Sequence, residues 1–245
     1  MTIYNKLLIK RFRDKERWQY SILDQNNFSI ALGQVDRYYT FLHDIYERYS
    51  HENEKYNQIN IFPQLQDGEK IHQVTEDEAV NLDKASYYGE LLQLDIESFY
   101  IFAKITIDKM ASFIEQYFGI ARGCSFKSHD CLLKSMDRYT FIKKIDVPKE
   151  FIDLAKELKI KISDYRDKQI EHYRNPRRLV GIANSKDGDI SLFPTFFNPK
   201  ESDFKVATSS SLPVLLEMIS EYFNLLCKII EGNRTKSTYE KKEEA

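Results

Sequence analysis

Apolar residues recur at steps of three and four along much of the chain, which is the spacing that places them on one face of an α-helix. The longest such run begins at Leu92 and ends at Gly119. Upstream of it, Thr75 and Glu78 have the spacing of a capping box, in which two side chains bind the free backbone N–H groups of a helix start. We therefore predict one long helix from just after Thr75 to Gly119. Its apolar positions are Leu92, Ile96, Phe99, Ala103, Ile107, Met110, Ile114 and Tyr117.

Further segments have the same spacing and are separated by breaks of polar residues, Gly or Pro. They predict helices over 28–49, over 131–145, from Pro148 to about residue 175, and from about Ser211 to Glu231. Residues 119–130 read as a connector. Two short β-prone segments flank Asp187 and Gly188, a pair that favours a hairpin turn. The predicted fold class is all-α, a helical bundle with one small β-hairpin near 179–193.

Turn-forming residues after the first predicted helix divide the chain. Pro63 and the Asp67-Gly68 pair interrupt any regular element there, so we place a boundary near residue 70. We predict an N-terminal helical extension packed on the bundle over 1–70 and the bundle with its hairpin over 71–232. The polar segment 233–245 is predicted to be a disordered tail.

Composition narrows the class of protein. The 245 residues hold 36 Lys and Arg against 38 Asp and Glu, a formal net charge of −2, so any nucleic-acid binding must come from a local patch. The sequence has no apolar run of about 18 residues and no signal peptide, which predicts no membrane partner. The cysteines, Cys124, Cys131 and Cys227, are too few for a disulfide framework, so we expect a cytoplasmic protein.

A local basic patch does occur between Lys156 and Arg178, which hold eight basic and four acidic residues. Basic side chains with interleaved aromatic rings can hold phosphates and stack on unpaired bases, so we predict RNA-binding roles for Lys168, Arg174, Tyr165 and Tyr173. The alternative is a solvated helix face with charges of both signs. By contrast, residues 76–97 carry seven acidic residues and one basic residue, which repel a polyanion.

Within this patch Arg166 is followed six residues later by His172. This pair resembles the R-x4-6-H signature of the HEPN superfamily, and the acidic Asp167 stands where members often carry Asn or Asp. The resemblance implies a small α-helical, commonly dimeric domain, and many members are metal-independent ribonucleases of toxin–antitoxin and phage-defence systems. An antitoxin protein is therefore an implied partner. Tyr173 directly follows the histidine, whereas members silenced by a nucleotidyltransferase carry a tyrosine two residues after it, so that mode of regulation is not supported.

Two other pairs have a similar spacing, and their contexts differ. Arg37 and His43 lie in a predicted aromatic core helix, whereas Arg122 opens the Gly-Cys-Ser connector that leads to His129. Neither context fits the family pattern. We therefore interpret the pair formed by Arg166 and His172 as the candidate site.

The resemblance implies catalytic roles for Arg166, His172 and Asp167. Six residues turn an ideal helix by about 600°, which leaves the arginine and the histidine about 120° apart. One helix would not bring the two side chains together, so we predict a homodimer in which two copies pool them. Arg166 would then stabilise charge on the scissile phosphate of single-stranded RNA, His172 would move protons, and Asp167 would orient one of them. The implied reaction needs no metal and no cofactor.

Two alternatives of other classes stay open. One is a non-catalytic HEPN-like dimeric module for interaction or nucleotide sensing, and the other is a helical protein of a different role. A zinc site at Cys124, His129 and Cys131 is disfavoured, since a structural zinc site takes four ligands and no second Cys pair is present. No Gly-rich phosphate loop or GxSxG nucleophile motif is found either.

Overall fold

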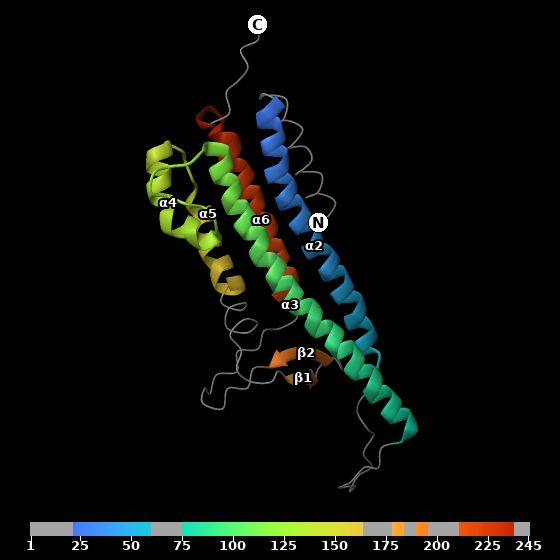
Figure 1. Cartoon of the computed structure of the whole chain (residues 1–245). Helices are drawn as coiled ribbons and strands as arrows, with labels where there is room; N and C mark the ends of the chain where they lie inside the picture. The colour runs from blue at the N-terminus through green and yellow to red at the C-terminus, as the bar shows by residue number, and fades with distance from the viewer. Residues whose placement is uncertain (1–21, 60–74, 164–177, 184–189, 196–210, 238–245) are drawn as a thin grey trace.

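The computed structural model of the chain describes residues 22–59, 75–163, 178–183, 190–195 and 211–237. These residues form a bundle whose longest members, α2, α3 and α6, run alongside one another, while the shorter α4 and α5 pack at the end where α3 finishes (Figure 1). The helices are α2 (Ile22–Asn57), α3 (Glu76–Phe118), α4 (His129–Lys143), α5 (Lys149–Leu158), the π-helix η1 (Lys159–Ser163), α6 (Ser211–Gly232) and the 3-10 helix η3 (Arg234–Lys236).

The predicted all-α bundle is confirmed. One hydrophobic core joins the helices, and its largest fully buried side chains come from α2, α3, α4, α5, α6 and the connector before α4. No helix in the described part of the chain has the length and apolarity needed to span a membrane. The largest fully buried side chains of the core include Phe99, Tyr117, Phe126, Tyr139, Phe151 and Tyr222.

Helix α3 begins and ends where the sequence predicts. The Thr75 hydroxyl accepts a hydrogen bond from the backbone N–H of Glu78 (3.3 Å), and the Glu78 carboxylate accepts one from the Thr75 N–H (2.7 Å). At the other end Gly119 has φ +78°, a left-handed value that favours glycine. The result is one helix of 43 residues, about 64 Å long at 1.5 Å per residue.

Helix α2 continues beyond its predicted end. The polar stretch 50–57 was predicted to be a loop, but it is helical as far as Asn57. The reason is that Tyr56 lies seven residues after Tyr49 and is buried like it, so two further turns keep an aromatic residue in the core. The Lys55 ammonium also lies 5.7 Å from the centre of the Tyr88 ring on α3, a favourable cation–π distance.

The helix predicted from Pro148 to about residue 175 changes from α-helix to π-helix after its first ten residues. It is α-helical to Leu158 and then forms the π-helix η1, and both Leu158 and Ile162 are fully buried. The remainder of that predicted helix, 164–175, lies outside the described residues. After that gap the strands β1 (Arg178–Ala183) and β2 (Ile190–Thr195) pair antiparallel, with residue 178 opposite 195 and residue 183 opposite 190. The Asp187-Gly188 turn is not among the described residues.

The described chain enters the segment 233–245 that was predicted to be a tail. Asn233 is buried and fastens the end of α6 to the segment between α4 and α5. Its side-chain oxygen accepts the Asp146 N–H (2.8 Å), and its side-chain nitrogen donates to the backbone oxygens of Asp146 (2.9 Å) and Ile229 (2.8 Å). Residues 238–245 lie outside the described part.

A charged pair joins α2 to α3. The Arg48 guanidinium donates through two nitrogens to one carboxylate oxygen of Asp95, with Nε at 2.8 Å. The Asp95 side chain is 2% exposed and the Arg48 side chain is 56% exposed. The hydrogen bond to Asp95 raises the pKa of Arg48. Because the two helices are antiparallel neighbours, this pair fixes one position of their mutual register.

We expect Arg48→Met to lower the free energy of unfolding by about 1–2 kcal/mol, because it leaves the buried Asp95 carboxylate without its counter-ion. The double variant Arg48→Met with Asp95→Leu should recover part of that loss, since it removes the stranded charge. Urea unfolding followed by circular dichroism measures both values. A double variant with a lower free energy of unfolding than Arg48→Met alone would contradict this account.

Asn233→Ala should cost about 2–3 kcal/mol of unfolding free energy, because it removes three hydrogen bonds and leaves backbone groups of Asp146 without those partners. Thr235→Ala, at an exposed position of η3, is the matched control and should stay within about 0.5 kcal/mol of the parent. Equal stability of the two variants would show that the Asn233 side chain does not hold the end of α6.

Candidate functional site

The predicted catalytic and RNA-binding residues all fall in 164–177, outside the described residues. The described chain reaches Ser163, three residues before the first of the candidate pair. Three lysines of the predicted basic patch are described, and two of them form ion pairs: Lys159 with Asp130 (3.2 Å) and Lys161 with Glu157 (3.7 Å). The undescribed residues are Tyr165, Arg166, Asp167, Lys168, His172, Tyr173 and Arg174.

The structure separates the members of the two rival Arg/His pairs. On α2, Arg37 is exposed, while His43 is buried and its Nδ1 lies 3.1 Å from the Glu47 carboxylate. Arg122 is exposed in the connector before α4, whereas His129 is completely buried. The connector predicted around Arg122 is thus confirmed as non-helical, and neither pair aims an arginine and a histidine into a common space.

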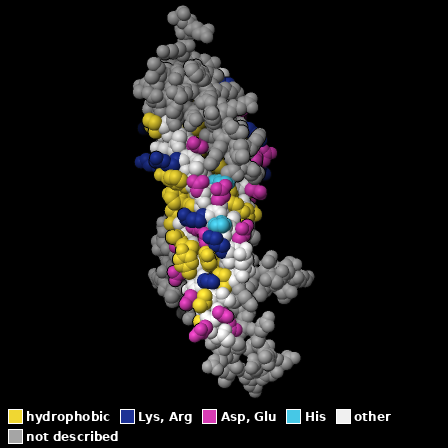
Figure 2. All heavy atoms as spheres, turned by 90° about the vertical axis from the view of Figure 1, so that its right-hand side faces the viewer, with side chains coloured by type: hydrophobic (Ala, Val, Ile, Leu, Met, Phe, Trp, Pro, Cys, Tyr) yellow, Lys and Arg dark blue, Asp and Glu magenta, His cyan; other side chains and the backbone are white. Residues whose placement is uncertain are grey.

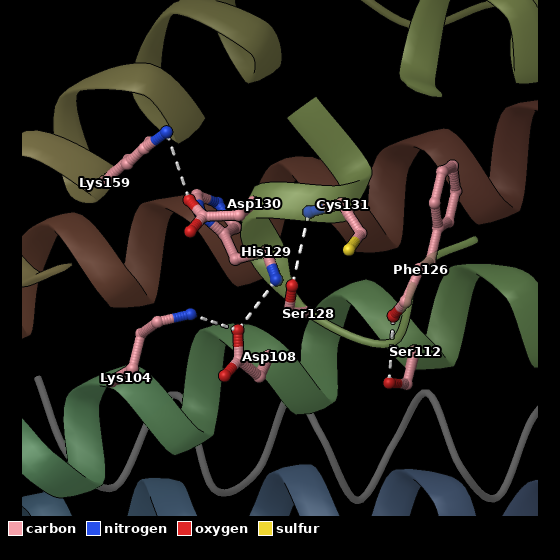
Figure 3. A network of polar contacts seen from close by, with 9 residues as sticks. All are labelled: Lys104, Asp108, Ser112, Phe126, Ser128, His129, Asp130, Cys131 and Lys159. Atoms are coloured by element: carbon pink, nitrogen blue, oxygen red, sulfur yellow. Dashed lines mark hydrogen bonds and ion pairs between the residues drawn. The ribbon is translucent and has the colours of Figure 1, made fainter. Parts of the chain in front are cut away.

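A polar cluster that the sequence did not predict lies where α3, α4 and η1 meet (Figure 3). We define the Lys104 cluster as Lys104, Asp108, His129, Asp130 and Lys159. The Lys104 ammonium is buried and lies 2.6 Å from an Asp108 oxygen, which also accepts the backbone N–H of His129 (2.7 Å). The Lys159–Asp130 ion pair continues the cluster onto η1.

Local sequence explains why the start of α4 lies in this cluster. Ser128 caps α4 by accepting a hydrogen bond from the Cys131 N–H (3.3 Å). The connector is held by the Ser112 hydroxyl, which donates to the backbone oxygen of Phe126 (3.1 Å). The positive end of the α4 dipole then faces the carboxylates of Asp108 and Asp130, which stabilises them there. The cluster therefore fixes both α4 and η1 against α3.

The imidazole of His129 is the most unusual group of the cluster. It is completely buried, neither ring nitrogen has a hydrogen-bond partner in the structure, and the ring packs edge-on against Tyr222 with centroids 5.5 Å apart. Burial, and secondly the nearby Lys104 charge, lower its pKa to about 4. The ring is therefore neutral near pH 7 and closed to substrate, so its role is packing rather than proton transfer.

Among the described residues, one group of three possible metal ligands is found, His43, Asp44 and Glu47, with ligand atoms within 4.8 Å of one another. Both carboxylates are exposed on α2, an arrangement that is common without any ion. The disfavoured zinc ligands do not form such a group in the described structure. Cys124 is buried, and Cys131 is half-buried on α4.

Comparison of the chain with protein-family models, with curated proteins and with solved structures finds no match. The function must therefore be argued from the residues themselves. A signal for the Lys104 cluster was present in the sequence, because Lys104 lies between the predicted buried positions Ala103 and Ile107 of the long helix. A charged residue on such a face needs a buried partner, and Asp108 at i+4 supplies it.

The neutral His129 predicts an acid-dependent loss of stability. Its pKa is about 4 in the folded protein and near 6.5 when unfolded, so the unfolded state binds more protons between these values. The contribution of this group is complete above pH 6.5 and is lost as the pH falls toward 4, by about 3 kcal/mol in total. Unfolding free energies measured from pH 7.5 to 4 should show this fall in the parent and a shallower fall in His129→Phe.

The exposed His51 provides the control for this measurement. His51→Phe should keep the pH dependence of the parent, because it replaces an exposed side chain on α2 and leaves the buried His129 imidazole in place. If His129→Phe and the parent follow the same pH profile, the buried imidazole does not account for the acid sensitivity.

Proposed function

We propose that the chain is a HEPN-like, metal-independent endoribonuclease that acts as a homodimer on single-stranded RNA, with Arg166, His172 and Asp167 as its catalytic residues. A role as the toxin of a toxin–antitoxin pair or as a phage-defence component, with an antitoxin protein as regulator, belongs to the same proposal. The observation that carries it is the Arg166–His172 spacing immediately after a core-anchored helix of an all-α bundle.

The described part of that helix supports the proposal. Leu158 and Ile162 are fully buried, so α5 and η1 are fixed in the core up to the residue before Ser163. Beyond it the sequence is rich in Arg and Lys, and it carries few apolar residues. The charged segment thus directly follows a helix that is fixed in the core. Such an anchor suits a site that must hold a guanidinium and an imidazole in defined positions.

The proposed reaction is transesterification within the RNA chain. The 2′-hydroxyl oxygen attacks the adjacent phosphorus, and the bond from phosphorus to the 5′-oxygen of the next nucleotide breaks. The products are a 2′,3′-cyclic phosphate and a 5′-hydroxyl end. His172 takes the proton of the attacking hydroxyl or returns one to the leaving oxygen, while Arg166 stabilises the added negative charge on the phosphate.

Asp167 orients the imidazole or the guanidinium of either protomer in this scheme. Lys168 and Arg174 hold flanking phosphates, and Tyr165 and Tyr173 stack on unpaired bases. A second copy is required, because Arg166 and His172 project about 120° apart from one ideal helix.

The test is incubation of the purified full-length protein with mixed RNA in the presence of a chelator. We expect cleavage that His172→Ala and Arg166→Ala each reduce by about 10²–10⁴-fold, the usual loss when a proton-transfer group or a charge-stabilising group is removed. Cyclic phosphate ends on the products, detected by resistance to ligation until the ends are opened, identify the reaction.

Arg37→Ala is the matched control, because Arg37 also precedes a histidine by six residues and is exposed on α2. Its RNA cleavage should equal that of the parent. Cleavage that survives in all three variants would refute the assignment of the site. An intact dimer that leaves every RNA uncut would instead favour the non-catalytic HEPN-like module.

A further inference from the structure

The outer face of α3 carries apolar side chains at a strict spacing of seven residues. Val80, Tyr87, Leu94 and Ile101 are 50%, 59%, 57% and 38% exposed, respectively. Seven residues are almost two full turns, so these four side chains form a stripe about 32 Å long on one side of the helix. We call them the α3 stripe. An exposed apolar patch of this size marks an interaction surface, and a spacing of seven residues is the one at which a second helix packs along the first.

The stripe is not an isolated row. Leu91 and Ile105 are half-buried beside it, and Phe102 lies next to Ile101. The Phe102 ring contacts Phe41 on α2 at a centroid distance of 5.4 Å, and Phe41 is itself 39% exposed. The apolar surface therefore continues from α3 onto α2. In the view onto the α2 side, hydrophobic side chains alternate with charged ones down the described face (Figure 2).

One flank of the stripe is acidic. Asp83, Glu90 and Glu97 each come three residues after a stripe residue, so they share the side of α3 that points away from α2. Asp83 and Glu90 are exposed, and Glu97 is half-buried with a hydrogen bond from Gln93 (3.0 Å).

The opposite flank, toward α2, presents basic groups. Lys84 comes four residues after Val80 and is exposed. Next to it, α2 contributes Lys55, whose side chain is 39% exposed, and Arg48, whose side chain is 56% exposed. Lys55 is paired with Glu52 and Arg48 with Asp95, but both remain in contact with water. The α3 stripe thus lies between an acidic and a basic edge.

We propose that the α3 stripe is the contact surface between two copies of this chain, with their α3 helices side by side and parallel. In that arrangement a two-fold axis runs along the helices, so each stripe residue faces its own counterpart. The rotation also places the acidic edge of one copy opposite the basic edge of the other, on both sides of the contact.

The charges favour the parallel arrangement over the antiparallel one. A two-fold axis perpendicular to the helices would place the acidic edges of the two copies opposite each other. The carboxylates of Asp83, Glu90 and Glu97 in one copy would then repel those in the other. The parallel pairing instead forms two rows of opposite charges around a dry apolar seam, as the flanking positions of parallel coiled coils do. The surface is therefore self-complementary in one orientation.

This inference deepens the homodimer of the proposed function but rests on α3 and α2 alone, so it stands whether or not the chain cleaves RNA. The test is the oligomeric state of the full chain by analytical ultracentrifugation over a range of concentrations. We expect a dimer in the parent. Leu94→Glu should weaken the dimer by about a hundredfold or more, because two like charges would be buried at the centre of the seam.

Ile120→Glu and Phe141→Glu are the matched controls. These residues are 81% and 83% exposed, and they lie outside the stripe, so both variants should remain dimers. Circular dichroism of each variant checks that helicity is retained, which an exposed position should allow. Loss of helicity in Leu94→Glu would move the test to Tyr87→Glu, which removes the ring of the next stripe residue.

Disulfide trapping determines the orientation. With the half-buried Cys131 changed to Ser, the separate variants Val80→Cys, Leu94→Cys and Ile101→Cys should each form a cross-linked dimer under mild oxidation. Antiparallel pairing would cross-link one of these positions at most. That pattern, a monomeric parent, or a dimer unaffected by Leu94→Glu would overturn the proposal. A parent that dimerises through the α3 stripe but leaves RNA uncut would support this contact surface and refute the nuclease, whereas a parent that cleaves RNA as a dimer unaffected by Leu94→Glu would do the reverse.

Discussion

Burial of one face of α3 is the interaction on which the described structure depends. Helices α2, α4 and α6 and the π-helix η1 all pack against this single 43-residue helix, and α5 is joined to it through α6 and η1. Two polar side chains on the buried face, Thr106 and Lys104, find partners within the helix itself. The Thr106 hydroxyl donates to the backbone oxygen of Phe102 (2.7 Å), and Lys104 pairs with Asp108 one turn on. A substitution on this face would therefore disturb every layer of the bundle at once.

Much of the architecture followed from the sequence, because helix periodicity and helix capping are local properties. The capping box of Thr75 and Glu78, the end of α3 at Gly119 and the extent of α6 were all readable from residues close to one another. The helical conformation of the polar stretch 50–57 of α2 could not be predicted in this way, because it depends on the burial of Tyr56 in the core formed with α3. The Arg48–Asp95 pair spans 47 residues and likewise has no local signal.

The candidate catalytic pair remains a prediction from sequence, because its residues lie outside the described part of the chain. The structure adds a physical reason for setting aside the two other Arg/His pairs. The context of His129 in the sequence already did not fit the family pattern, and its complete burial makes the ring a packing element that excludes charge. His43 is buried on α2 beside Glu47. Burial thus gives a second, independent reason to treat these two histidines as structural.

The π-helical turn of η1 has a consequence for how this chain can vary. A π-turn accommodates one more residue than an α-turn and has the form of a single-residue insertion within a helix. If one residue were removed from 159–163, the α-helical hydrogen bonding of α5 could continue unbroken, and the later residues would keep their positions around the helix axis, because the residue lost is the extra one of the π-turn. The same deletion within α5 itself would turn every later residue by about 100° about the axis. The π-turn is thus the place where this helix can change in length by one residue without redirecting the chain that follows.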